Sequence, residues 1–204
     1  MVSYFGGILS VFEDKGKLLA IGGFNYAGNT ILNNIGYWTG GEWKPLGSGI
    51  VGGAYYSTAI PLVLLGPSGL TQFTRMNDTM YLGGSFELLG TVPCSNITTY
   101  NEGSTGCVGG GVSESHNPSS PGAFNPAQIT SMEAIGSDLY VTGDFQKAGN
   151  SPIETIAKWD GQQWSALGNG VEIHGNRYLK LAEDSSHALV VAGNFYKAGG
   201  NPCN

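Results

Sequence analysis

Residues 24–38 read Phe-Asn-Tyr-Ala-Gly-Asn-Thr-Ile-Leu-Asn-Asn-Ile-Gly-Tyr-Trp, and this segment sets the pattern of the whole chain. Its framework recurs without insertion or deletion at 86–100 and 145–159, and a fourth copy opens at Phe195. Glycines lie two residues before and four residues after each Phe, which indicates backbone angles or close approaches that a Cβ would forbid. The chain is therefore a repeat protein. These glycines are Gly22, Gly84, Gly143 and Gly193, followed by Gly28, Gly90, Gly149 and Gly199.

Apolar residues at fixed distances before each Phe predict a pair of strands. Residues four and six positions before the Phe indicate one buried strand per unit, and residues 16 and 13 positions before it indicate the preceding strand. We expect a hairpin turn between the two strands, at 15–17, 77–78, 136–138 and 184–186. The apolar positions are Ile8, Val11, Leu18 and Ala20; Leu70, Phe73, Met80 and Leu82; Ile129, Met132, Leu139 and Val141; and Leu179, Ala182, Leu189 and Val191.

Downstream of the Phe, each unit carries an Ile, then an aromatic residue, then a polar turn, and it closes on Gly-Ile or Gly-Val. Four short strands fit in each unit. The units cover 8–50, 70–112 and 129–171, with a partial fourth unit at 179–204. The joining segments shorten from 19 to 16 to 7 residues, which is typical of surface loops.

Successive Phe positions are separated by 62, 59 and 50 residues, and four short strands at this period are typical of a β-propeller blade. The main alternative is a β-solenoid, whose coils are usually shorter. We therefore expect residues 1–204 to form one all-β region of propeller-type, four-stranded antiparallel blades, with three full units and a partial fourth.

Residues 156–171 read Ile-Ala-Lys-Trp-Asp-Gly-Gln-Gln-Trp-Ser-Ala-Leu-Gly-Asn-Gly-Val. This motif resembles the Trp-Asp-Gly-x-x-Trp-x-x-Leu-Gly repeats of secreted and cell-surface propellers, such as Rax2-like polarity-marker ectodomains, and more distantly kelch repeats. The resemblance covers nearly the whole chain outside the joining loops. It is more specific for fold than for function. The second unit departs from the motif, with Tyr100 and Thr105 in place of the two Trp residues.

Two cysteines of the second unit replace apolar residues of the other units. Cys94 and Cys107 align with Leu32 and Pro45 in the first unit and with Ile153 and Ala166 in the third. Because both positions change together, we expect a disulfide between neighbouring strands, and hence an oxidising compartment.

Cys203 aligns with Cys94, so its partner is expected 13 residues further on, past the last residue of the chain. This suggests a segment of a larger protein. The alternative is a free or intermolecular cysteine in a complete chain.

Composition also favours a secretory-pathway glycoprotein, located outside the cell or on its surface. Charged residues make up 12% of the chain, against about 25% in ordinary soluble domains. Sequons at Asn77 and Asn96 predict glycosylation, at a hairpin turn and at the start of a strand. The N-terminus shows no signal peptide, so a leader would have been removed or would lie outside the segment.

Charge and hydropathy argue against two classes of partner. The net charge of −6 and the pI near 4.9 argue against a nucleic-acid partner, which needs clustered Lys and Arg. The most apolar run, 60–65, is too short to span a bilayer, so no membrane insertion is expected within this segment. This run either packs on its own unit or forms an apolar contact surface.

Signals for catalysis, cofactors or metals are few, and we expect none of the three. The histidines, His116, His174 and His187, fall in predicted loops or turns without metal-binding spacing. Glu133 and Asp144 are candidates for the two facing carboxylates of a glycosidase, although sequence cannot place them opposite each other. The recurring Trp residues are interpreted as packing groups. The candidate ligand-facing aromatics are Tyr26, Tyr55, Tyr56 and Tyr196.

Three functional classes follow from these observations. The first is a non-catalytic interaction, adhesion or scaffold module of an extracellular repeat protein, whose partners are other protein domains, copies of itself or glycans. The second is a structural subunit of an extracellular filament or coat, completed by strand addition. The third is a secreted carbohydrate-active enzyme.

Overall fold

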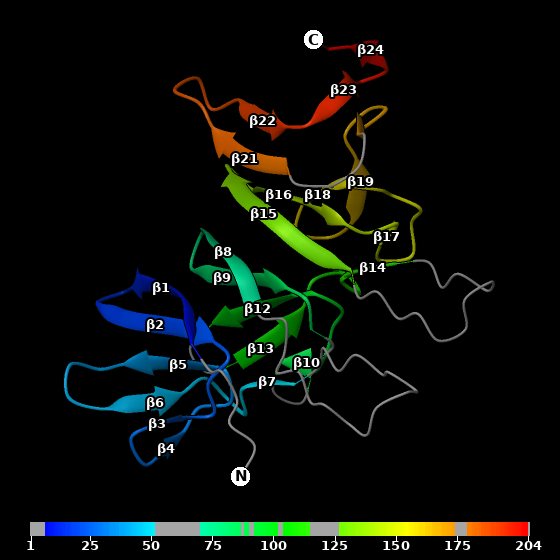
Figure 1. The fold of residues 1–204 in the computed structure, drawn as a ribbon. Coiled ribbons are helices and arrows are strands. Elements are labelled where there is room, and N and C mark those ends of the chain that lie inside the picture. Colours follow the sequence, from blue (N-terminus) through cyan, green and yellow to red (C-terminus); the bar gives the residue numbers. More distant parts are fainter. Residues whose placement is uncertain are drawn as a thin grey trace.

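The computed structural model describes residues 7–51, 70–86, 88–89, 92–101, 104–114, 127–173 and 179–203. Within these ranges every regular element is a β-strand, and all pairings between strands are antiparallel. No helix in the described part of the chain is long and apolar enough to cross a bilayer. The expectation of an all-β fold is confirmed. Figure 1 shows the sheets following one another along the chain, from β1 at one end to β24 at the other.

Three four-stranded sheets have the same strand order, in which a hairpin is extended by two further strands. The turns predicted at 15–17, 77–78 and 136–138 are found between the first two strands of each sheet, at 15–16, 77–78 and 136–137, because Lys17 and Asp138 already belong to the second strand. The first sheet contains β1 (Ile8–Asp14), β2 (Lys17–Gly22), β5 (Ile35–Trp38) and β6 (Trp43–Pro45). The second contains β8 (Leu70–Met76), β9 (Thr79–Gly84), β12 (Ile97–Asn101) and β13 (Ser104–Cys107). The third contains β15 (Gln128–Ile135), β16 (Asp138–Asp144), β18 (Ile156–Trp159) and β19 (Trp164–Ala166). A two-stranded sheet of β21 (Leu179–Glu183) and β22 (Leu189–Gly193) follows.

Short strands join one unit to the next. A closing strand ends each of the first three units and pairs with the short strand that begins at the Phe of the next unit or shortly after it. The closing strands are β7 (Ile50–Val51), β14 (Val112–Ser113) and β20 (Val171–Ile173). Their partners are β10 (Leu88–Leu89), β17 (Lys147–Ala148) and β23 (Phe195–Ala198). The remaining short strands are β3 (Tyr26–Ala27), β4 (Thr30–Ile31), β11 (Val92–Pro93) and β24 (Asn201–Pro202).

One backbone arrangement recurs in the first three units, ten residues after the Phe. Asn34, Asn96 and Thr155 occupy this position with left-handed φ values of 75°, 66° and 65°. Each donates its backbone N–H to the carbonyl of the Phe and accepts from the glycine two residues before the Phe. A Cβ on Gly22 or Gly143 would overlap the backbone carbonyl of Gly7 or Gln128, respectively, which explains the glycine at this position.

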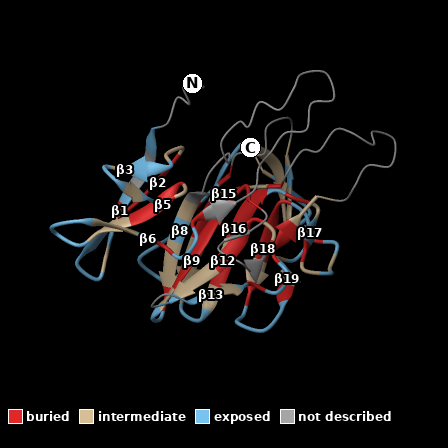
Figure 2. Ribbon diagram, turned by 90° about the horizontal axis from the view of Figure 1, so that it is seen from below, coloured by how far each residue is buried: buried red, intermediate tan, exposed pale blue. Residues whose placement is uncertain are grey.

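Apolar side chains fill the spaces between consecutive sheets. One core cluster contains Leu19 and Ile21 of the first sheet with Met80 and Leu82 of the second. A second cluster lies between the second and third sheets. Figure 2 shows the resulting burial along β9, β12, β16 and β18, whereas β3 is exposed.

The repeated Phe residues do not all have the same surroundings. Phe86 and Phe145 are buried, because each packs towards the preceding unit, while Phe24 and Phe195 are only half-buried. Phe24 has no preceding unit among the described residues. At the position of Phe195 the described sheet has only two strands, β21 and β22.

Candidate interaction surface

We call the face of each four-stranded sheet that is directed towards the preceding unit its leading face, and the opposite face its trailing face. In the third sheet the leading face is buried against the second: Ile129 and Leu139 are fully buried, and Met132 is 5% exposed. The aligned residues of the first sheet are exposed: Ile8 by 59%, Leu18 by 45% and Val11 by 52%. Equivalent apolar positions therefore form a core in one unit and an open surface in another.

Two tryptophans belong to the same face of the first sheet. Leu18 pairs with Trp38, which in turn pairs with Trp43, so the three side chains lie on one side of the sheet. The ring centroids of Trp38 and Trp43 are 5.7 Å apart with planes at 55°. The corresponding pair of the third unit, Trp159 and Trp164, has nearly the same geometry, at 5.3 Å and 51°.

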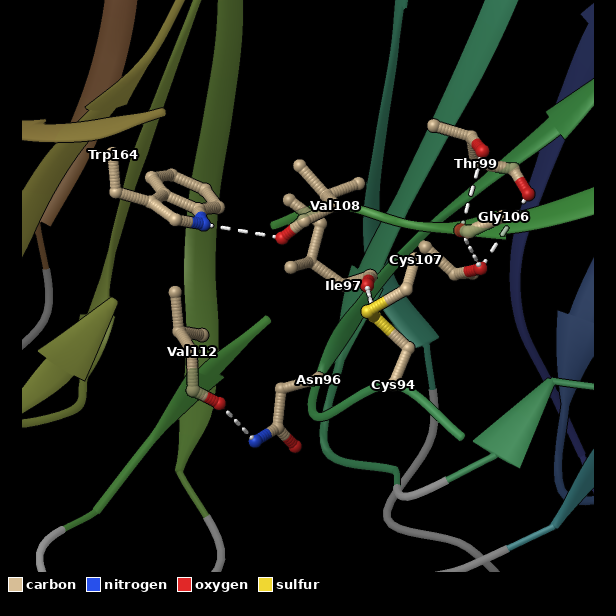
Figure 3. Close-up of a disulfide and its surroundings, with 10 residues drawn as sticks. Cys94, Asn96, Ile97, Thr99, Gly106, Cys107, Val108, Val112 and Trp164 are labelled. Carbon is tan, nitrogen blue, oxygen red and sulfur yellow. Dashed lines mark hydrogen bonds between the residues drawn. A yellow bond between two sulfur atoms is a disulfide. The ribbon is translucent and has the colours of Figure 1, made fainter. Parts of the chain in front are cut away.

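The surroundings of the two tryptophan pairs differ. Trp159 and Trp164 are buried, and the Trp164 indole N–H donates to the carbonyl of Val108 in the second unit at 3.1 Å (Figure 3). Gly109 packs directly on the two rings, and an added Cβ there would overlap Trp159. Trp38 and Trp43 are half-buried. The sequence interpretation of the Trp residues as packing groups therefore holds for the third unit, while the first unit leaves an aromatic pair accessible.

The β3–β4 hairpin borders this surface. Tyr26 on β3 is 63% exposed and Ile31 on β4 is 55% exposed. Within the described ranges β3 pairs only with β4, whereas the aligned strands β10, β17 and β23 also pair with a closing strand. The leading face of the first sheet is thus continuous with an open strand edge.

Of the other predicted aromatics, only Tyr196 can be placed. Its hydroxyl donates to Glu172 at 2.9 Å, and the same carboxylate contacts Lys197, which also lies over the Tyr196 ring. These contacts link β20 to β23. The hydrogen bonds from Tyr196 and Lys197 lower the pKa of Glu172, while the Glu172 carboxylate raises the pKa of Tyr196.

The structure does not bring the predicted aromatics together into one site. Tyr26 lies on β3 and Tyr196 on β23, at opposite ends of the row of sheets (Figure 1). Tyr55 and Tyr56 lie outside the described residues, as do His116, His174 and the apolar run at 60–65. His187 is exposed in a turn, where its Nδ1 contacts Glu183 at 2.5 Å.

The predicted disulfide is confirmed. Cys94 and Cys107 are bonded, with Cα atoms 5.2 Å apart, and they join the segment before β12 to the end of β13 (Figure 3). Cys203 has no disulfide partner among the described residues.

The two predicted glycosylation sites differ in accessibility. Asn96 is 5% exposed; its Nδ2 donates to the Val112 carbonyl at 2.7 Å, and its Oδ1 accepts from the Phe86 amide at 3.0 Å. The amide nitrogen of Asn96 is thus buried and hydrogen-bonded, which argues against a glycan at this position. Asn77 is exposed in its hairpin turn and stays a predicted site.

The two carboxylates considered for a glycosidase do not face each other. Asp144 pairs with Gln128, five residues along β15 from Glu133, which corresponds to roughly 16 Å. Glycosidase carboxylates lie about 5–9.5 Å apart. Burial and the nearby Glu183 carboxylate raise the pKa of Glu133. The described residues contain no cluster of three His, Cys, Asp or Glu side chains that could hold a metal ion.

Comparisons with known proteins add little. No family model and no curated protein matches the chain. The solved structures that match include the extracellular domain of a candidate one-component system from B. thetaiotaomicron. The identity is 12% and the TM-score 0.49, over 92% of this chain and 20% of that structure. The chain therefore spans about a fifth of that structure, and a likeness of this size carries no argument about fold or function.

Proposed function

We propose that the chain is a non-catalytic interaction or scaffold module of an extracellular repeat protein, built from propeller-type units. The exposed leading face of the first sheet is the observation that carries this proposal. Several large apolar side chains on a surface indicate a contact site for another molecule. Aromatic residues such as Trp38, Trp43 and Tyr26 are also the types enriched at the energetic centres of interfaces.

Three properties support an extracellular setting. The disulfide between Cys94 and Cys107 requires an oxidising environment to form and persist. The sequon at Asn77 lies in an exposed turn that would accommodate a glycan. The low fraction of charged residues leaves neutral polar groups to provide solubility.

The proposal can be tested with the isolated monomer. We expect the full chain to be retained by one or more immobilised extracellular polysaccharides or matrix proteins on an array. Replacing Val11 and Ile31 with Ser should lower this retention at least tenfold. Val190→Ser is a matched control, because Val190 is 42% exposed but lies on β22, away from the first sheet. Equal retention of all three proteins, or retention of none, would reject the proposal.

A filament or coat subunit is the second candidate, and the row of sheets gives it specific support. The leading face of the first sheet and the exposed apolar Val190 lie on the first and last sheets of the row (Figure 1). A contact between unlike ends generates an open fibre when the rotation between copies does not close into a ring. The full chain would then form regular fibres at micromolar concentration, and deleting residues 179–204 would abolish them. A chain that stays monomeric at all concentrations would exclude this candidate.

A further inference from the structure

We propose that the leading face of the first sheet and the open edge of β3 together dock a further complete unit of the same repeat type. This inference rests on the proposed interaction function and names the partner of the same surface. The inference is based on the two interfaces between consecutive four-stranded sheets of the chain. In both, the trailing face of one sheet covers the leading face of the next.

The first part of the argument is strand register. Ile50, Val112 and Val171 each pair with the residue three positions after the Phe of the next unit. In the first unit this residue is Ala27 on β3. A closing Gly-Ile or Gly-Val strand of the docked unit would therefore lie antiparallel to Tyr26–Ala27.

Backbone hydrogen bonds extend this register. The Gly149 amide donates to Gly111 at 2.7 Å, and the Gly199 amide donates to Gly170 at 2.9 Å. The Gln146 amide likewise donates to Ser113 at 3.0 Å. The aligned donors in the first unit are the amides of Gly28 and Asn25, whose residues are exposed. Among the described residues neither amide has a recorded backbone acceptor, so both could donate to a closing strand.

The tryptophan pair provides the second part. Trp38 and Trp43 already have the mutual geometry that Trp159 and Trp164 have under Gly109. Such a preformed pair loses little conformational freedom on binding. The docked unit would place the glycine of its Leu-Gly turn on the rings, and the carbonyl just before that glycine would accept the Trp43 indole N–H.

The apolar surface provides the third part. The trailing face of the first sheet covers the second sheet with Phe12, Leu19 and Ile21. A complete unit presents an equivalent apolar trailing face, whereas a lone extended strand does not. Docking of a whole unit would therefore bury Ile8, Val11 and Leu18 together with the tryptophans, as the third sheet buries the aligned residues.

A second copy of this chain is a poorer occupant. Its three described closing strands, β7, β14 and β20, are already paired within their own chain. The trailing faces of its first two sheets are covered by the next sheet. Its third sheet is followed by β21, whose backbone amide at Leu181 donates to Ser131 of β15.

The inference can be tested by placing an extra copy of residues 127–178 in front of the complete chain. The segment that joins the closing strand of the extra copy to Ile8 then has a length within the range of the natural joining segments. Amide hydrogen exchange of Asn25 and Gly28 should slow at least tenfold relative to the natural chain, and Trp43 emission should shift to the blue. As an independent probe, a synthetic peptide of residues 165–173, added at millimolar concentration, should shift the NMR signals of Gly28 and the Trp43 indole.

A matched control alters only the extra copy, by Gly168→Asn. Gly168 has φ +54° and open space around it, and Asn tolerates that angle, so the copy itself is little perturbed. In the docked position the new side chain would overlap the Trp38 ring, and the protection of the Asn25 and Gly28 amides should be lost.

Unprotected amides in the fusion together with no peptide-induced shifts would overturn the proposal. Protection that increases with concentration in the natural chain would overturn it in favour of a second copy. Neither result depends on the array experiment that tests the proposed function.

Discussion

At the scale of single residues, Asn96 shows how one side chain secures the junction between two units. Its amide group joins the Phe86 amide to the Val112 carbonyl, and its backbone takes the left-handed conformation with φ 66°. Asn is among the few residue types that adopt this conformation readily. The sequon at this position therefore coincides with a buried residue that has a structural role.

Replacing Asn96 with Ala should lower the free energy of unfolding by about 2–4 kcal/mol, because two buried backbone groups lose their partners at a left-handed position. Urea denaturation would measure the change. Asn77→Ala is the matched control, since Asn77 also has a left-handed φ of 54° but is exposed. Asn77→Ala should lower the free energy of unfolding by about 1 kcal/mol or less. Equal losses for both variants would contradict the role assigned to the Asn96 side chain.

Asp160 in the Trp-Asp-Gly turn should make stability depend on pH. Its Oδ1 accepts the backbone amides of Gln163 and Gln162, each at 2.8 Å, and these bonds lower the pKa of the carboxyl. Because the pKa is lower in the folded state, the stabilisation is present above the ordinary carboxyl pKa and is lost as pH falls through the folded value. We expect a shallower loss of stability between about pH 4 and pH 2 in Asp160→Asn. Thermal melts across this range would measure it, and identical pH profiles would contradict it.

At the scale of strands and hairpins, the disulfide fastens the second unit. Cys94 and Cys107 are separated by 13 residues, and the bond closes a loop over the turn between β12 and β13. The aligned positions of the third unit carry Ile153, which is buried, and Ala166 instead. The covalent bond therefore lies where the third unit has a buried isoleucine and an exposed alanine.

Replacing both cysteines with Ala should lower the free energy of unfolding by about 3 kcal/mol, because the disulfide restricts the unfolded chain across a loop of this length. Denaturation of the double variant, compared with the natural chain with and without reductant, would test this. The reductant should destabilise the natural chain and leave the variant unchanged. A variant as stable as the oxidised chain would contradict the expectation.

Glu133 on β15 should have the opposite pH behaviour from Asp160. Burial and the Glu183 carboxylate on β21 raise its pKa, so the folded chain favours the protonated form. This group therefore destabilises the fold at neutral pH, and the effect disappears as pH falls below the ordinary carboxyl pKa. Glu133→Gln should raise the melting temperature at pH 7 and leave it nearly unchanged at pH 3. A variant that is less stable at pH 7 would contradict this.

At the scale of the whole molecule, each sheet obtains its core from its neighbours. The trailing face of one sheet and the leading face of the next bury each other, and the closing strand seals the same junction. This nearest-neighbour pattern is typical of repeat proteins. The equivalent positions of the first sheet are apolar but exposed, which is the basis of the proposed interaction.

Aligned residues in different units should therefore respond differently to the same truncation. Met132 is buried in the third unit, and Met132→Ala should lower the free energy of unfolding by about 2–5 kcal/mol. Val11 at the aligned position is 52% exposed. Val11→Ala should therefore change the free energy of unfolding by at most about 0.5 kcal/mol. Chemical denaturation of both variants would measure the difference. A large loss in Val11→Ala would show that the leading face of the first sheet is covered in solution.

Local sequence determined the strands, the hairpin turns and the disulfide. Alternating apolar residues, turn residues and glycines act over a few positions, so the pairs β1–β2, β8–β9 and β15–β16 could be predicted by counting from the Phe. The paired change at Cys94 and Cys107 likewise needs only the alignment of the units. The short strands around the Phe were missed, because two-residue strands carry no periodic signal.

Only the tertiary structure decided which aligned residues are buried. Ile8 and Ile129 occupy the same position of the repeat, yet Ile8 is exposed and Ile129 is in the core, because in the described part of the chain only Ile129 has a sheet packed against it. The same holds for Trp43 and Trp164, and for the sequon at Asn96, whose burial depends on Val112 of the closing strand. Burial is a property of the junction between units, and no single unit's sequence contains it.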